Sequence, residues 1–353
     1  MKRIRYIAIF FIIAALLLQI GCSTVSKNAR QENEAGVEQN AADGAAGTSD
    51  KDTSSGKTDG NEHGTGEGAN DEKAGNEADE EADNQEIKHA FDELIKNDDI
   101  TLEEIIGFLD ENMGKLSKND ASALLIRFEE LQKENLSSLE EQYFSEGVQN
   151  KIYNTVDPGS PLDLDNIDSV KDPELKELLV KTRDSGYKVE TAEGMYFPVL
   201  DYEFYKKYAA YTNDDIKEYV DLMAVESNKV PAKDAALMIG WDELVKRALK
   251  MEEFIFTYVD SVKFDDVKDL YDKYVNFIIY GLNNTPLFSY DKKTMNEKAR
   301  AAYTDVVREP GDSRLLQILK DYLKVIENNN YTLTDEVETY RTQARDNLQQ
   351  LGC

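Results

Sequence analysis

The feature that most constrains this chain is an abrupt change in composition near residue 86. Residues 23–85 contain no Phe, Trp, Tyr, Leu, Ile or Met, and they carry 16 acidic and 5 basic side chains. Such a segment cannot bury enough apolar surface to offset the entropy that is lost on ordering. We therefore expect residues 23–85 to be a disordered acidic linker and residues 86–353 to be a folded domain, with a possible subdivision near residues 157–200.

The folded part has the spacing of amphipathic helices. Thr101 and Ser117 precede apolar stripes and stand where helix N-caps are expected. Pro231 is a favourable first-turn residue, and the apolar side chains after it predict a buried helix that continues through Trp241 to Tyr258. Further helices are expected at residues 172–183, 265–280, 294–307, 312–326 and 334–348.

Only residues 186–200 have a persuasive β pattern. Two runs of β-prone residues flank Ala192-Glu193-Gly194, and this arrangement predicts a small hairpin with its turn at those three residues.

The N-terminus has the pattern of a secretory signal. Lys2, Arg3 and Arg5 precede an unbroken apolar run from Tyr6 to Leu18, which is the arrangement of a signal peptide. As a helix this run spans about 20 Å, short of the roughly 30 Å hydrocarbon core, so we favour cleavage over a permanent transmembrane anchor. The predicted fold class is all-α: a multi-helix domain with one small β-hairpin, preceded by a signal peptide and a disordered acidic linker.

The end of the apolar run resembles the lipobox of bacterial lipoproteins. Leu18 is followed by Gln19 and then by Ile20-Gly21-Cys22. In that family the cysteine is diacylglycerated, carries palmitate-type chains and becomes the new N-terminus. The resemblance implies lipidation of Cys22, a membrane partner through that lipid, and a location on the outer face of the cytoplasmic membrane. The chain departs from the family at Gln19, where leucine is usual.

Net charge and cysteine content restrict the partners and bonds that we expect. The formal net charge is −29, which argues against nucleic acid because its binding requires clustered Lys and Arg. The two cysteines are Cys22 and Cys353. If Cys22 is lipidated, no intrachain disulfide can form, and Cys353 is a free thiol or an intermolecular link.

The sequence lacks the side-chain sets that common enzymes use. Its two histidines are His63, in the linker, and His89, near the first helix. No HExxH, paired CxxC, GxSxG or glycine-rich phosphate loop occurs, so we do not expect zinc hydrolysis, thiol catalysis or P-loop chemistry. We predict no cofactor and no metal, and a binding role rather than catalysis.

Carboxylates could still form a glycan-cleaving site. Glu193, Asp201 and Glu203 lie among aromatic residues, and such enzymes need two acids, one of them in an apolar pocket. The alternative is a hairpin edge with exposed acids.

An acidic stretch could bind calcium. Asp163, Asp165, Asp168 and Glu174 are spaced so that the last is twelfth from the first, as in an EF-hand loop. However, Ile167 offers no side-chain oxygen, and Asp168 occupies the position at which that loop needs glycine. The simpler interpretation is a solvated connector before a helix.

The candidate ligand surface combines two segments of the folded part. Around residues 193–211 and 280–290, directional hydrogen-bonding groups occur together with aromatic rings, as small-ligand sites require. The alternative is that aromatic residues at helical spacing belong to the core. The residues assigned to this surface are Glu193, Tyr196, Tyr202, Tyr205, Asn283, Asn284 and Thr285.

The segments Glu193–Tyr208 and Tyr280–Tyr290 also resemble parts of uncharacterised lipoproteins from spore-forming Gram-positive bacteria, which implies exposure outside the cytoplasmic membrane and no known activity. The sequence thus favours a membrane-anchored, non-enzymatic lipoprotein that binds an unknown envelope protein or small ligand. The alternative is a carboxylate-based glycan-cleaving enzyme. A solute-binding transport component is disfavoured, since such proteins resemble two α/β lobes and strand signals here are few.

Overall fold

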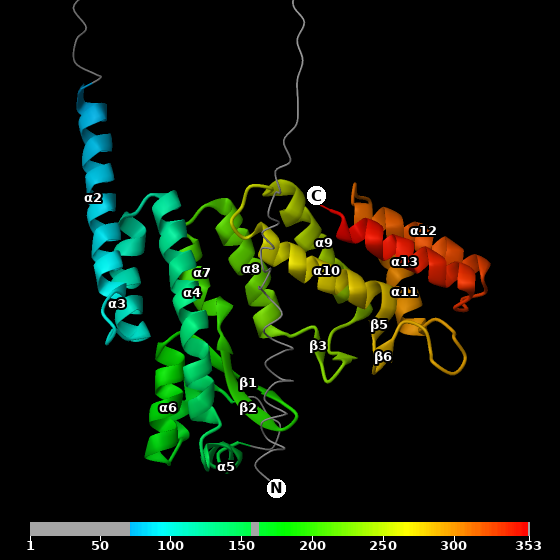
Figure 1. Cartoon of the computed structure of the whole chain (residues 1–353), viewed down its shortest axis with the longest axis horizontal. Helices are drawn as coiled ribbons and strands as arrows, with labels where there is room; N and C mark the ends of the chain where they lie inside the picture. The colour runs from blue at the N-terminus through cyan, green and yellow to red at the C-terminus, as the bar shows by residue number, and fades with distance from the viewer. Residues whose placement is uncertain (1–70, 157–161, 352–353) are drawn as a thin grey trace, which may run out of the picture. The chain divides into compact units, whose positions relative to one another are not determined.

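The computed structural model describes residues 71–156 and 162–351, with side chains from residue 81 onward. Most of the described residues are helical (Figure 1). The elements in chain order are α2 (Asp71–Ile95), α3 (Leu102–Asn112), η1 (Met113–Lys115), α4 (Lys118–Tyr143), α5 (Val148–Tyr153), η2 (Leu164–Ser169), α6 (Pro173–Asp184), β1 (Tyr187–Ala192), β2 (Met195–Leu200), α7 (Tyr202–Ala209), α8 (Asp214–Asn228), β3 (Ala232–Lys233), β4 (Ala236–Leu237), α9 (Trp241–Thr257), α10 (Phe264–Tyr280), β5 (Gly281–Leu282), β6 (Thr285–Pro286), α11 (Glu297–Val306), α12 (Arg314–Asn328) and α13 (Asp335–Gln349).

Helix α2 extends into the segment that we expected to be disordered. It begins at Asp71, so residues 71–85 are helical. Ala and Glu in this segment have high intrinsic helix propensity, so residues 71–85 can form a helix although they have little apolar surface to bury. From Glu81 onward the chain forms one compact unit. The signal peptide (residues 1–22) and residues 23–70 of the linker lie outside the described residues.

The two predicted N-caps are confirmed. Thr101 Oγ1 accepts a hydrogen bond from the backbone N–H of Glu104 at 3.2 Å, and Glu104 Oε2 accepts from the backbone N–H of Thr101 at 3.0 Å. This reciprocal pair is a capping box and starts α3. Ser117 Oγ accepts from the N–H of Asp120 at 3.2 Å and starts α4. Helix α4 then packs against β2 and α7.

The predicted hairpin at residues 186–200 is also confirmed. Strands β1 and β2 are antiparallel, with Tyr187 opposite Leu200 and Ala192 opposite Met195. Glu193 and Gly194 form the turn, with φ of 49° and 76°. Positive φ at both central residues matches the right-handed twist of the strands.

The helix predicted from Pro231 starts instead at Trp241, so its first ten expected residues were predicted wrongly. Strands β3 and β4 form a second hairpin, whose turn residues Asp234 and Ala235 have φ of 48° and 55°. Gly240, which we placed inside the helix, is extended (φ −68°, ψ 154°) and forms its N-cap. The apolar residues before Trp241 are therefore spaced as in a helix, although they form a hairpin.

A third hairpin, β5–β6, was not predicted either. Leu282 pairs with Thr285 across a turn at Asn283 and Asn284. Two-residue strands are too short to leave an alternating pattern in the sequence, which is the signal that a strand prediction needs.

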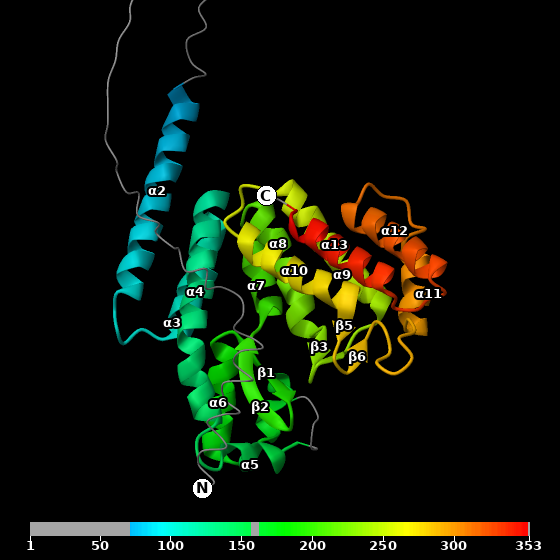
Figure 2. The same ribbon diagram turned by 45° about the vertical axis from the view of Figure 1, so that its right-hand side comes forward.

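Helices α10 to α13 lie close to their predicted positions. Helix α9 packs against α10 and α11, and α13 packs against α12 and α10 (Figure 2). Trp241 meets the buried ring of Tyr303 edge to face at 5.8 Å. The Tyr303 hydroxyl donates to the carbonyl of Ile278 at 2.8 Å, which satisfies its polar group inside the core. None of the helices in the described ranges combines the length and apolar character needed to cross a membrane.

Candidate functional site

Three members of the predicted ligand surface belong to the core. Tyr196, Tyr202 and Tyr205 are buried, with 0%, 6% and 1% of their surface exposed. The ring of Tyr202 stacks on that of Tyr205 at 5.3 Å. For these three residues the structure therefore shows the alternative, a place in the core: Tyr202 and Tyr205 recur at helical spacing because one face of α7 packs against the rest of the domain, and Tyr196 is on β2.

Tyr202 on α7 and Tyr219 on α8 bond to a buried ion pair. Glu129 on α4 lies 2.6 Å from Lys263 Nζ and 2.9 Å from Lys133 Nζ. It also accepts hydrogen bonds from the hydroxyls of Tyr202 at 2.5 Å and Tyr219 at 2.7 Å. Burial by itself would raise the pKa of Glu129, but the two lysines and the hydrogen bond from Tyr202 lower it to about 2.

Little space remains beside this network. The void next to Glu129, Tyr219 and Lys263 measures about 10 Å³, which is near the lower limit for a single water molecule. The network therefore connects helices and offers no room for an organic ligand.

The three carboxylates of the glycan-cleaving alternative do not converge. Asp201 accepts from the backbone N–H of Glu203 at 3.1 Å and caps α7. Glu203 pairs with Lys206 at 3.0 Å, and this lysine holds the pKa of Glu203 below its ordinary value. A general acid needs the opposite shift. Glu193 lies apart, in the exposed β1–β2 turn.

The carboxylates of the calcium alternative are each engaged elsewhere. Asp163 accepts from the backbone N–H of Asp165 at 2.9 Å. Asp168 pairs with Lys176 at 2.9 Å, and Glu174 pairs with Lys151 at 2.5 Å. Across residues 81–156 and 162–351, no group of three or more His, Cys, Asp or Glu side chains is arranged to hold a metal ion.

Asn284 and Thr285, two further residues of the predicted ligand surface, form hydrogen bonds between two hairpins. Asn284 donates from its backbone N–H to the Ala235 carbonyl at 2.8 Å, and from Nδ2 to the Asp234 carbonyl at 2.6 Å. Thr285 Oγ1 accepts from the backbone N–H of Leu237 at 3.1 Å. The turn of β5–β6 is thus bonded to β3–β4.

A lysine continues this connection to the first hairpin. Lys233 on β3 donates from Nζ to Glu190 Oε2 at 2.8 Å and to the Thr191 carbonyl at 3.0 Å, both on β1. The two segments that the sequence singled out, around Glu193 and Asn283, are therefore joined through a hairpin that it did not predict. Figure 1 shows the three hairpins next to one another.

Two large apolar side chains are exposed beside these hairpins. Met238 follows β4 and is 52% exposed, and Tyr290 follows β6 and is 72% exposed. The Tyr290 hydroxyl donates to the carbonyl of Asn283 at 3.1 Å, so the ring is held against the turn. We define the hairpin face as these two side chains together with the turns at residues 193–194, 234–235 and 283–284.

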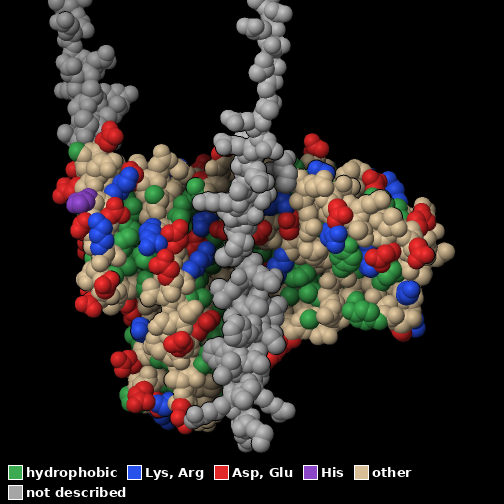
Figure 3. All heavy atoms as spheres, in the orientation of Figure 1, with side chains coloured by type: hydrophobic (Ala, Val, Ile, Leu, Met, Phe, Trp, Pro, Cys, Tyr) green, Lys and Arg blue, Asp and Glu red, His purple; other side chains and the backbone are tan. Residues whose placement is uncertain are grey.

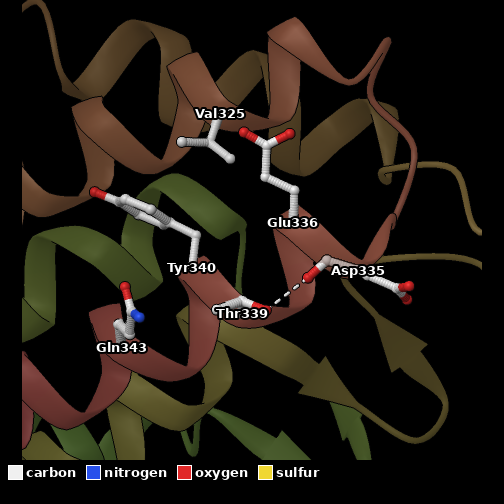
Figure 4. A pocket seen from close by; sticks show the side chains of 6 residues that line it. All are labelled: Val325, Asp335, Glu336, Thr339, Tyr340 and Gln343. Carbon is white, nitrogen blue, oxygen red and sulfur yellow. Dashed lines mark hydrogen bonds between the residues drawn. The ribbon is translucent and has the colours of Figure 1, made fainter.

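A groove in the C-terminal helices was missed by the sequence analysis. It opens between α12 and α13, has a volume of about 400 Å³ and is lined by Val325, Asp335, Glu336, Thr339, Tyr340 and Gln343 (Figure 4). The spacing of the α13 residues indicates one helix face. However, nothing in the sequence shows that α12 leaves this face partly open.

Charges of both signs are interspersed over the surface that Figure 3 shows.

The chain matches no protein-family model, and no curated protein or solved structure is significantly similar to it.

Proposed function

We propose that this protein is a lipoprotein, anchored through lipid on Cys22 to the outer face of the cytoplasmic membrane, and that its helical domain binds an envelope protein without catalysis. The hairpin face carries this proposal. It joins the two segments singled out in the sequence, and two side chains that are more than half exposed, Met238 and Tyr290, follow its hairpins β3–β4 and β5–β6. The lipobox-like residues Ile20-Gly21-Cys22 support the anchor.

Two properties of the hairpin face favour binding of a partner: its exposed residue types, and turns that are already ordered in the free protein. Methionine and tyrosine are enriched at protein interfaces, where a few buried side chains provide most of the binding free energy. The turns of β3–β4 and β5–β6 are already bonded to each other through Asn284 and Thr285. A partner therefore does not have to order these turns, and the entropic cost of association falls.

A pair of double variants tests the binding surface. Met238→Ala with Tyr290→Ala removes the two exposed apolar groups of the hairpin face. The matched control is Phe256→Ala with Val262→Ala, since these side chains are 56% and 72% exposed. Phe256 is near the far end of α9, about 22 Å along the helix axis from Trp241.

The measurement is crosslinking in intact envelopes followed by quantitative mass spectrometry. We expect at least one crosslinked protein to be captured equally by the wild type and the control variant, and about tenfold less by the hairpin-face variant. Equal capture by all three chains would show that the hairpin face is not the binding surface.

The anchor is tested separately. We expect Cys22→Ser to release the protein from the membrane fraction, because the acyl chains that hold it there are lost. Cys353→Ser is the control, since it removes the other cysteine and leaves the lipobox-like residues intact. Retention of the Cys22→Ser chain, or an unlipidated Cys22 in mass spectra of the mature protein, would rule out the anchor and leave the hairpin face untouched.

A further inference from the structure

A basic segment follows Tyr290, one of the two exposed side chains of the hairpin face. Residues 290–300 contain four cations and two acids, so this segment has a local net charge of +2 in a chain whose formal net charge is −29. All four cations are exposed. We define the basic border as the side chains of Lys292, Lys293, Lys298 and Arg300.

The loop that carries the basic border is fixed by backbone hydrogen bonds. Phe288 and Met295 form an antiparallel bridge at its base. The N–H of Lys293 donates to the Ser289 carbonyl at 2.9 Å, and the N–H of Leu333 donates to the Lys293 carbonyl at 2.7 Å. Figure 1 shows this loop, in orange, directly after β6. The border is therefore held beside the β5–β6 hairpin before any partner binds.

The positive charges of the border are not neutralised within the domain. Among residues 81–156 and 162–351, no carboxylate forms an ion pair with any of its four cations, whereas Lys233 in the neighbouring hairpin pairs with Glu190 at 2.8 Å. The guanidinium group of Arg300 lies 3.4 Å from the centroid of the Tyr331 ring, which orients it and leaves its charge in place. These charges are available to a partner.

Two of the lysines occupy positions that local physical chemistry disfavours. Lys293 has a φ of 54°, in the left-handed region where glycine and asparagine are preferred. Lys298 lies in the first turn of α11, where the helix dipole favours acidic side chains over basic ones. Residues that break local rules without a gain for the fold are expected at functional surfaces. The fold thus gives no reason for a positive charge at either position.

We propose that the hairpin face binds an acidic protein segment, with its carboxylates at the basic border and an apolar side chain against the ring of Tyr290. This inference rests on the proposed function, because it names the chemistry of the partner for the same surface. Glu193 and Asp234 are exposed in the turns of the other two hairpins. Their charges repel an acidic segment there and so direct its carboxylates to the border.

The test is fluorescence anisotropy of a rhodamine-labelled peptide in which pairs of glutamates alternate with single leucines. The full-length protein is titrated into it in non-ionic detergent. A peptide with glutamine in place of every glutamate is the control. We expect saturable binding of the glutamate peptide and a Kd for the glutamine peptide that is weaker by about tenfold or more. The affinity should fall as salt is added, because the cations are exposed.

A triple variant removes three charges of the border: Lys292→Gln, Lys293→Asn and Lys298→Gln. Asparagine is chosen at position 293 because it tolerates the left-handed region. We expect this border variant to bind the glutamate peptide about tenfold more weakly, or less tightly still. Circular dichroism checks that it is folded.

The control variant removes three exposed lysines outside the hairpin face: Lys171→Gln, Lys181→Gln and Lys217→Gln. It changes the net charge of the chain by the same amount as the border variant, so the long-range repulsion of an acidic peptide by the two chains is matched. We expect it to bind the glutamate peptide like the wild type.

Three results would each overturn the inference: no saturable binding of the glutamate peptide, equal affinity for the glutamine peptide, or full affinity in the border variant. If Met238→Ala with Tyr290→Ala still abolishes capture in envelopes, the hairpin face then binds a partner of different chemistry. Conversely, charge-dependent binding of the peptide together with unchanged capture by the Met238→Ala, Tyr290→Ala chain would end the proposed function and leave the acid-binding border.

Discussion

The Nζ atom of Lys263 lies 2.6 Å from Oε2 of Glu129, although 134 residues separate the two in the chain. Both side chains are buried. Glu129 belongs to α4, and Lys263 is the N-cap residue of α10. The pair therefore joins the N-terminal helices to the C-terminal ones inside the core, and several consequences can be measured.

Removing the cation should be costly. We expect Lys263→Met to lower the free energy of unfolding by about 3–5 kcal/mol, because Glu129 is left buried with Lys133 as its remaining ionic partner. The control is Lys250→Met, which breaks an exposed pair with Glu253 and should cost less than about 1 kcal/mol. Urea unfolding measures both values. Similar costs for the two variants would contradict a special role for the buried pair.

The same pair predicts a pH dependence. The pKa of Glu129 is about 2 in the folded protein, below its ordinary value of 4.5. A lowered folded-state pKa contributes stability above the unfolded value and loses it as the pH falls toward the folded value. The stability advantage of the wild type over Glu129→Gln should therefore shrink between pH 4.5 and about 2. A difference that stays constant in urea unfolding across this range would contradict the prediction.

The stability that Glu252 contributes should change with pH in the opposite direction. It is buried and accepts from the backbone N–H of Leu315 at 2.8 Å, at the start of α12. Burial raises the pKa of Glu252 above its ordinary value despite this bond and a second one from Ser313. A raised folded-state pKa contributes stability at low pH that is lost as the pH rises through that pKa. Relative to Glu252→Gln, which keeps an acceptor for Leu315, the wild type should lose stability as the pH rises above 4.5. The opposite slope in urea titrations would contradict this assignment.

Loss of a hydrogen bond between the hairpins should increase hydrogen exchange locally. Thr285→Val removes the acceptor of the Leu237 N–H and should cost about 1–2 kcal/mol. Hydrogen exchange over residues 232–238 should accelerate more than exchange elsewhere in the domain. Thr304→Val is the control, since the Thr304 hydroxyl only donates to a carbonyl of its own helix. Equal acceleration in both variants would mean that Thr285 does not hold β3–β4.

Gly281 should not tolerate a side chain. Its backbone has φ 75° and ψ −159°, and a Cβ there would meet the Leu287 backbone nitrogen at 2.4 Å and the Thr285 carbonyl oxygen at 2.5 Å. We expect Gly281→Ala to cost more than about 3 kcal/mol, because the conformational penalty adds to a clash with backbone. Gly147→Ala, at φ 87° with open space around it, should cost about 1 kcal/mol. Thermal unfolding compares the two, and equal losses would refute the steric argument.

Local chemistry determined most of the helices. The caps at Thr101 and Ser117 and the apolar stripes of α10 to α13 depend on residues within a few positions of one another, so they could be found from the sequence. The β1–β2 hairpin was found for the same reason, since its turn at Glu193 and Gly194 is a local signal. The candidate site was found only in part: Asn283, Asn284 and Thr285 are in the bonded turns.

Tertiary contacts decided the rest. Whether Tyr205 formed a ligand platform or core depended on what covers α7, and the partner of Glu129 lies 134 residues away. The segment after Pro231 had a helical apolar pattern, yet Asn284 binds the carbonyl groups of its turn and favours a hairpin. The groove at Tyr340 exists because two helices with separate sequences leave a space between them. Each of these features depends on burial or on a hydrogen-bond partner distant in the chain, which a local pattern does not contain.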